Sequence, residues 1–321
     1  MEENNEQQPV GTPDGPTEAA AAVAEVELIP LLPESKKSRK GVIAGVATLA
    51  ILAGGIGFAA VRSSGPGVIS LTKSAQLTER QHTARVEMTM QLPMAGLANK
   101  PLLATGLYDF DRKLTTVDMD ITDALGSKMP STGNPDAGKA TMTIQGLVAY
   151  MKIGLFDMAP GLKGKWIKMD IGSMAGASGV DIAKATQLGG NDPSAVLEQM
   201  KASSDKVESI GKEVVQGLTT THYQATIDIE KFYRDRNAVL DETKFAALLK
   251  LYTGPLTVDA WVDAKGLLRR IHETIPMKAA PLDLIMEFSD FGTPVSISLP
   301  ADADVVDQSA LAETAQIKVP A

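Results

Sequence analysis

The sequence predicts an α+β fold in which one large antiparallel sheet carries helices on one face. Short segments with strict alternation of apolar and polar residues recur along the chain, which is typical of strands with one buried face. Turn residues such as Gly133-Asn134-Pro135 and Gln216-Gly217 separate these segments. Helical blocks precede and interrupt the strands. This order of helix, strands, helices and strands indicates a single α+β domain.

Three helices are expected in this domain. The first runs from about 68 to 80, where Val68, Leu71 and Ala75 recur at helical spacing. The second begins after Asp192, with Pro193 at its first helical position. The third spans about 230 to 252.

The alternating segments predict the strands and the side chains that face the core. In the segment ARVEMTMQL, Val86, Met88 and Met90 alternate with charged and polar residues. The same alternation appears at 117–121, 166–171, 221–227, 258–262 and 282–288. We therefore expect one apolar and one polar face along each of these strands.

A membrane anchor is predicted before this domain. Residues 1–40 are rich in Glu, Gln, Pro and Ala and are expected to be a disordered cytoplasmic tail. Residues 41–61 carry no charge, and as a helix they would reach about 30 Å, the thickness of a hydrocarbon core. We assign 41–62 to a transmembrane helix, 63–67 to a linker, 68–307 to the folded domain and 308–321 to a C-terminal tail.

Flanking charge predicts the orientation of this segment. Four basic residues lie within 36–40, whereas only Arg62 follows closely, so the N-terminus is placed in the cytoplasm and the domain outside it. A cleaved signal peptide with Gly57 and Ala59 before the cut is the alternative. The long apolar core and the forty preceding residues favour an uncleaved anchor.

Small residues within the predicted anchor allow close helix packing. Gly41 and Gly45 form a GxxxG pair, which is compatible with a homodimer through the membrane helix. Small residues are also common in membrane helices that do not associate, and this second interpretation is preferred.

Composition excludes several classes of function. A net charge of −8 argues against nucleic-acid binding, which requires a basic face. The absence of cysteine excludes disulfides, thiolate metal sites, cysteine catalysis and a thioether lipid anchor.

No catalytic or metal-binding motif is present, so we expect neither an enzyme nor a cofactor. The histidines lack zinc-ligand spacing, and His222 is expected to be structural and to face solvent. His272 and Glu273 are adjacent on a strand and therefore point to opposite faces. Asp118 and Asp120 fall on a polar strand face rather than in a calcium loop.

Fourteen methionines are the most informative feature of the composition. Several of them fall at inward strand positions, where a flexible and polarisable side chain suits an adaptable apolar surface. Methionine also fills ordinary cores, so the residues alone leave both interpretations open.

The domain resembles the LppX/LprG group of actinobacterial envelope lipoproteins, relatives of the carrier LolA, over roughly 68–307. The resemblance lies in the order and spacing of five strings: LVAYMKIG at 147–154, KGKWIKMDI at 163–171, VVQGLTTTHYQATIDI at 214–229, VDAWVDAKGLLRRIHETI at 258–275 and MEFSDFGTPVSISLPADADVVD at 286–307. It implies a curved sheet forming an incomplete, LolA-like barrel over helices, with an apolar cavity for acyl chains.

The resemblance also implies a function and a set of lining residues. The protein would bind or carry a lipid or lipoglycan ligand outside the plasma membrane, with a transmembrane anchor in place of the lipidated cysteine of its relatives. The positions expected to line the cavity are Val86, Met88, Met90, Met119, Ile121, Met142, Met169, Tyr223, Ile227, Leu284, Met286 and Phe288. The alternatives are a regulatory ectodomain that senses the envelope through a partner, and a structural surface domain without ligand.

Overall fold

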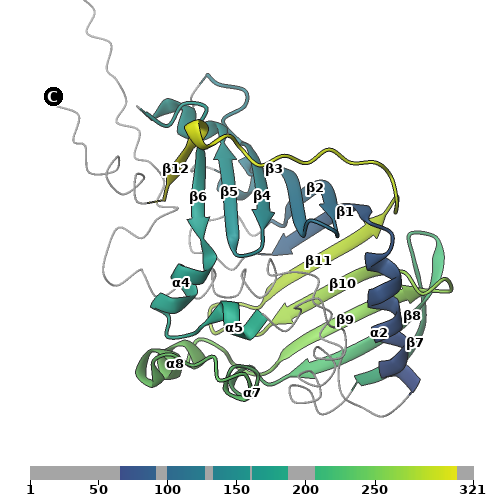
Figure 1. Ribbon diagram of the computed structural model, residues 1–321. Helices are drawn as coiled ribbons and strands as arrows, with labels where there is room; N and C mark the ends of the chain where they lie inside the picture. Colours follow the sequence, from purple (N-terminus) through teal and green to yellow (C-terminus); the bar gives the residue numbers. More distant parts are fainter. Residues whose placement is uncertain (1–65, 92–99, 127–132, 160, 187–206, 309–321) are drawn as a thin grey trace, which may run out of the picture.

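The computed structural model describes residues 66–91, 100–126, 133–159, 161–186 and 207–308. Within these ranges, twelve strands form one sheet with the order β12-β6-β5-β4-β3-β2-β1-β11-β10-β9-β8-β7 (Figure 1). The strands are β1 (Thr83–Gln91), β2 (Leu102–Asp109), β3 (Leu114–Asp120), β4 (Lys139–Gln145), β5 (Val148–Ile153), β6 (Trp166–Asp170), β7 (Val207–Val215), β8 (Leu218–Ile227), β9 (Leu256–Asp263), β10 (Leu268–Ile275), β11 (Leu282–Ser289) and β12 (Val305–Asp307).

The sheet is open and almost entirely antiparallel. β1 lies at its centre, paired with β2 on one side and with β11 on the other. The last strand, β12, pairs with β6 in parallel and forms one edge, while β7 forms the other edge. The predicted fold class, one large antiparallel sheet with helices, is therefore confirmed, with β12 as the parallel exception.

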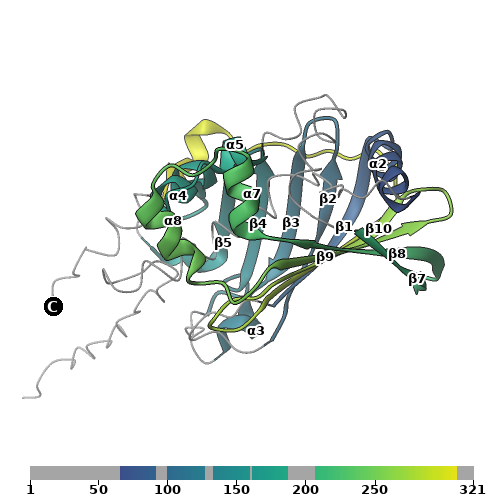
Figure 2. The same cartoon turned by 90° about the horizontal axis from the view of Figure 1, so that it is seen from below.

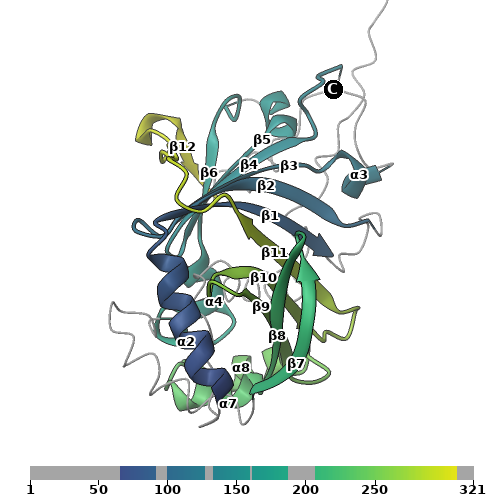
Figure 3. The same cartoon turned by 90° about the vertical axis from the view of Figure 1, so that its right-hand side faces the viewer.

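The sheet coils strongly along its length. The strands β4 to β6 and the strands β8 to β10 run in clearly different directions across the molecule (Figure 1, Figure 3). Coiling of this kind follows from the right-handed twist of each strand. It gives the sheet a concave side without closing it into a barrel.

Helices lie at two ends of the sheet. The helices α4 (Ile171–Ala177), α5 (Ile182–Thr186), α7 (Ile229–Asp235) and α8 (Glu242–Leu249) gather at one end, and α2 (Pro66–Glu79) lies at the other (Figure 2). The short α3 (Thr122–Leu125) follows β3, and single 3₁₀ turns occupy Gly154–Met158 and Asp302–Asp304. α2 agrees with the first predicted helix.

The prediction of one helix over 230–252 was wrong. The chain forms two helices there, because the left-handed backbone at Asn237, with φ 49°, ends the first. Asp241 then caps the second by accepting a hydrogen bond from the Lys244 N–H at 3.0 Å. Asp241 is a typical helix-capping residue, but apolar residues continue at helical spacing on both sides of it, so the sequence predicted one helix.

Several predictions fall outside the described residues. They include the tail 1–40, the membrane segment 41–62, the helix after Asp192 and the C-terminal tail from 309 onward. Of the helices that the structure describes, none is long and apolar enough to span a membrane.

One apolar cluster joins the helices to the sheet. It contains Leu71 of α2, Ile182 of α5 and Phe245 of α8 together with inward residues of most strands. Burial of this apolar surface is the main favourable contribution to folding in a chain without disulfides.

Candidate apolar binding face

The residues predicted to line a cavity occur on a single face of the sheet, named here the inner face. Strand registers establish this, because directly paired residues of antiparallel strands point to the same side. Val86 pairs with Phe288, Met88 with Met286, and Met90 with Leu284. On the other strands, Met119 pairs with Ala104, Met142 with Val117, Met169 with Ala149, Tyr223 with Ala260 and Ile227 with Leu256. Ile121 follows β3 at the same parity as Met119.

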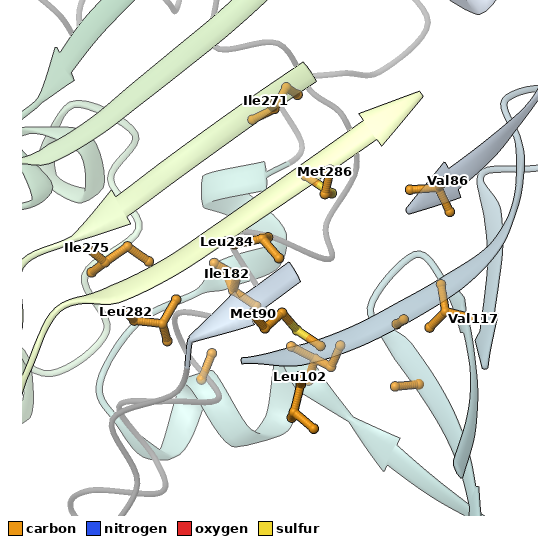
Figure 4. Close-up of a cluster of buried hydrophobic side chains, with 14 of the residues drawn as sticks. Val86, Met90, Leu102, Val117, Ile182, Ile271, Ile275, Leu282, Leu284 and Met286 are labelled. Atoms are coloured by element: carbon orange, nitrogen blue, oxygen red, sulfur yellow. The ribbon is translucent and has the colours of Figure 1, made fainter. Parts of the chain in front are cut away.

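The middle of the inner face is formed by β1, β11 and β10. Leu282, Leu284 and Met286 of β11 point toward the same side as Met90 of β1, and Ile182 of α5 is seen behind them in the same view (Figure 4). All of these residues belong to the apolar cluster. The helix α5 therefore contributes a fully buried side chain, Ile182, to the same cluster as this part of the sheet.

The predicted residues divide into two groups by exposure. The buried group is Val86, Met90, Ile121, Tyr223, Ile227, Leu284, Met286 and Phe288. The remaining four, Met88, Met119, Met142 and Met169, pack against the cluster but stay partly exposed. Among the predicted lining residues, the four that keep exposed surface are thus all methionines, whose side chains are adaptable.

Met151 and Glu273 are among the inner-face residues that the sequence analysis missed. Met151 pairs with Met142 and is also partly exposed. Glu273 lies between Ile271 and Ile275 at inward parity. The alternation of Ile271, Glu273 and Ile275 contained this signal, but Glu273 was considered only in relation to its neighbour His272.

The outer face of the sheet carries polar side chains, among them His222. The prediction that the His222 side chain faces solvent was wrong. His222 is buried, at 8% exposure, rather than facing solvent. Its Nδ1 lies 2.8 Å from Glu213 Oε1 and its Nε2 lies 2.7 Å from Asp259 Oδ1. The Trp261 ring stacks on it at 4.3 Å between centroids and donates to Glu213 Oε2 at 2.8 Å.

The burial of His222 has a physical reason. Strand parity places it on the outer face as expected, but the long side chains of Trp261 and Glu213 fold over it. The hydrogen bonds with Trp261 and His222 hold the pKa of the Glu213 carboxyl below its usual range. Because both imidazole nitrogens are engaged by carboxylates, this cluster stabilises the pairing of β7, β8 and β9.

The aspartates of DMDITD are engaged on the outer face. Thr141 Oγ1 donates to Asp118 at 2.6 Å, and Lys139 Nζ lies 2.6 Å from Asp120. The Lys139 hydrogen bond lowers the pKa of Asp120 to about 2. In the part of the chain that the structure describes, no group of three or more acidic or histidine side chains is placed to hold a metal ion.

Comparison with known proteins finds one curated relative and several solved structures. No family model matches the sequence. The relative is an "uncharacterized 31.2 kDa protein in rplA-rplJ intergenic region" of Streptomyces griseus, 35% identical over 158 residues that cover 47% of this chain and 50% of the relative. The chain therefore spans about half the length of the curated relative that it matches.

The solved structures include members of the group that the sequence resembles. Lipoprotein LppX of Mycobacterium tuberculosis has 14% identity and a TM-score of 0.38, and the match covers 72% of this chain and 99% of LppX. LprF of Mycobacterium bovis has 15% identity and a TM-score of 0.37, covering 73% and 96%. A LolA superfamily protein of Nitrosomonas europaea has 10% identity and a TM-score of 0.24, covering 72% and 94%. The strand order and registers of this chain define its fold.

Proposed function

We propose that this protein is a membrane-anchored, extracytoplasmic binder or carrier of lipids or lipoglycans, and not an enzyme. Acyl chains would lie against the inner face of the sheet. The observation that carries the proposal is the set of partly exposed methionines, Met88, Met119, Met142, Met151 and Met169, on a predominantly apolar face.

Methionines in this position suit a ligand of variable shape. Each has three rotatable bonds and a polarisable sulfur, so the surface can follow different acyl chains. Each methylene group that leaves water contributes about 0.8 kcal/mol, so a long acyl chain is bound by many small increments. Such a site needs few polar groups.

The proposed location rests on the sequence before the domain. The uncharged segment 41–61 follows a basic cluster at 36–40, which favours a cytoplasmic N-terminus and an exported domain. A protein anchored in this way would hold its lipid close to the outer surface of the plasma membrane. The resemblance to envelope lipoproteins, including relatives of LolA, agrees with that position.

The test combines lipid content with a pair of tryptophan substitutions. Full-length protein is purified, and its lipids are extracted and identified by mass spectrometry. Met142→Trp adds bulk at a partly exposed inner-face position, so it should reduce lipid occupancy several-fold with little change in melting temperature. Met90→Trp adds the same bulk at a buried position, 5% exposed, and should overpack the core at a cost of about 1–3 kcal/mol.

Two results would contradict the proposal. The first is parent protein that contains no lipid and takes up none from added vesicles. The second is equal destabilisation by the two substitutions with unchanged lipid content, which would indicate a closed core at both positions.

A further inference from the structure

Glu273 is a carboxyl group set within the apolar inner face. On β10 it lies between Ile271 and Ile275, both of which are buried and point to the same side (Figure 4 shows both). Its paired residues on the neighbouring strands are Leu284 of β11 and Val258 of β9. All four surrounding positions are therefore apolar.

Among the described residues, Glu273 has no hydrogen-bond or ion-pair partner. Its Oε2 is buried and unpaired, whereas several polar groups on the opposite face of the same strands are paired. There, Asp283 accepts from Thr274 at 2.7 Å and contacts His272 at 3.2 Å. Burial raises the pKa of the Glu273 carboxyl to about 8, so the group carries a proton at neutral pH.

A neutral carboxyl group offers one O–H donor and acceptor oxygens. Leaving it unpaired in an apolar setting costs about 1–3 kcal/mol, and leucine at the same position would avoid that cost. A pure hydrocarbon chain offers no acceptor for the O–H. An ammonium group would require the ionised carboxylate, which the apolar surroundings disfavour.

We propose that Glu273 is a specificity-determining residue that donates a hydrogen bond to the ester carbonyl oxygen of a bound acyl-ester lipid, an inference that rests on the proposed function. This contact would fix how deeply the lipid enters the inner face, with acyl chains on either side of β10. The ligand class is then an ester-linked lipid rather than a free hydrocarbon or an ether lipid.

The experiment is a competition between two matched lipids. Full-length protein in detergent is incubated with equimolar dipalmitoylglycerol and dihexadecylglycerol, its diether analogue, which lacks the carbonyl groups. The bound ratio is measured by mass spectrometry. One hydrogen bond of about 0.5–1.5 kcal/mol predicts an ester preference of roughly 2- to 10-fold in the parent protein.

Three variants separate this role from a structural one. Glu273→Leu should bind both lipids in a ratio near 1 while total lipid binding persists. Glu273→Gln keeps an N–H donor and should retain the ester preference. Glu87→Leu makes the same change at an exposed position on the outer face of β1, and it should leave the ratio at the parent value.

Every outcome decides the inference. Equal binding of the two lipids by the parent, or an ester preference that survives in Glu273→Leu, overturns the role of Glu273 and leaves the proposed function standing. Failure of the parent to bind either lipid overturns the role of Glu273, while the lipid content of the purified protein tests the proposed function separately. A change in melting temperature without a change in ratio would identify Glu273 as structural only. If Glu273→Leu does not fold, loss of the preference in a folded Glu273→Gln would also overturn the inference.

Discussion

At the scale of single residues, the sheet holds buried polar side chains in two different settings. His222 shows the first case, with carboxylates on both ring nitrogens. Glu273 shows the second, with a buried oxygen that has no partner. Strand parity predicted which face each residue occupies. Parity says nothing about which neighbouring side chains cover an outer-face residue, and this is why His222 was expected to be exposed.

The isolated carboxyl of Glu273 predicts a pH-dependent stability. The pKa is raised from about 4.5 in the unfolded chain to about 8 in the folded protein, so the folded state binds the proton more tightly between these values. Stability from this group is therefore fully present below pH 4.5 and is lost as pH rises toward 8, at up to about 1.4 kcal/mol per pH unit.

Denaturant unfolding of the parent and of Glu273→Gln between pH 5 and pH 8 measures this contribution. The glutamine variant has no proton to lose, so its stability relative to the parent should increase with pH. The other titrating groups are common to both proteins and cancel in the difference. Parallel stability curves over this range would contradict the burial of the carboxyl.

At the scale of elements, β2 and β3 approach each other closely at Gly106. Gly106 lies in β2 on the inner face, paired with Val86 and with Val117. A Cβ atom at this position would lie 1.9 Å from the Thr116 carbonyl oxygen, which belongs to the backbone and has little room to move. Glycine in a strand often marks such an approach.

Gly106→Ala should therefore destabilise the domain by about 2 kcal/mol or more, because the two strands must separate. Gly176→Ala is the matched control, since an added Cβ at that position in α4 meets nothing within 4 Å. That control should be neutral or stabilise by up to about 1 kcal/mol. Thermal melting of the two variants measures the difference, and equal melting temperatures would refute the close approach.

At the scale of the whole molecule, the orientation in the membrane is the prediction with the widest consequences. The chain contains no cysteine, so a single introduced cysteine gives an unambiguous label. A cysteine at Ser35 should react with an impermeant maleimide only after the cells are opened, while one at Ser64 should react in intact cells. The reason is the excess of basic residues before the segment 41–61.

Two labelling patterns would oppose this orientation. Reaction of both positions in intact cells would place the N-terminus outside, and reaction of neither would leave the domain in the cytoplasm. A mature chain that starts near residue 60 would instead show cleavage of the segment.

The sequence by itself determined the fold class, the first helix and the two faces of the strands. These depend on periodicity, and the alternation in β1 or β11 is a local property that the chain carries wherever it folds. The sequence did not predict the end of α7 at Asp235, because the left-handed residue that follows the helix, Asn237, does not interrupt the apolar pattern.

Only the tertiary structure decided which residues share an environment. Sheet order brings Met142 beside Met151 and Glu273 beside Leu284. It also separates buried Met90 from partly exposed Met142, although both are inward methionines in the sequence. The physical reason is that exposure and pairing depend on the neighbouring strands and covering helices, and the coiling of the sheet brings these together across long separations in the chain.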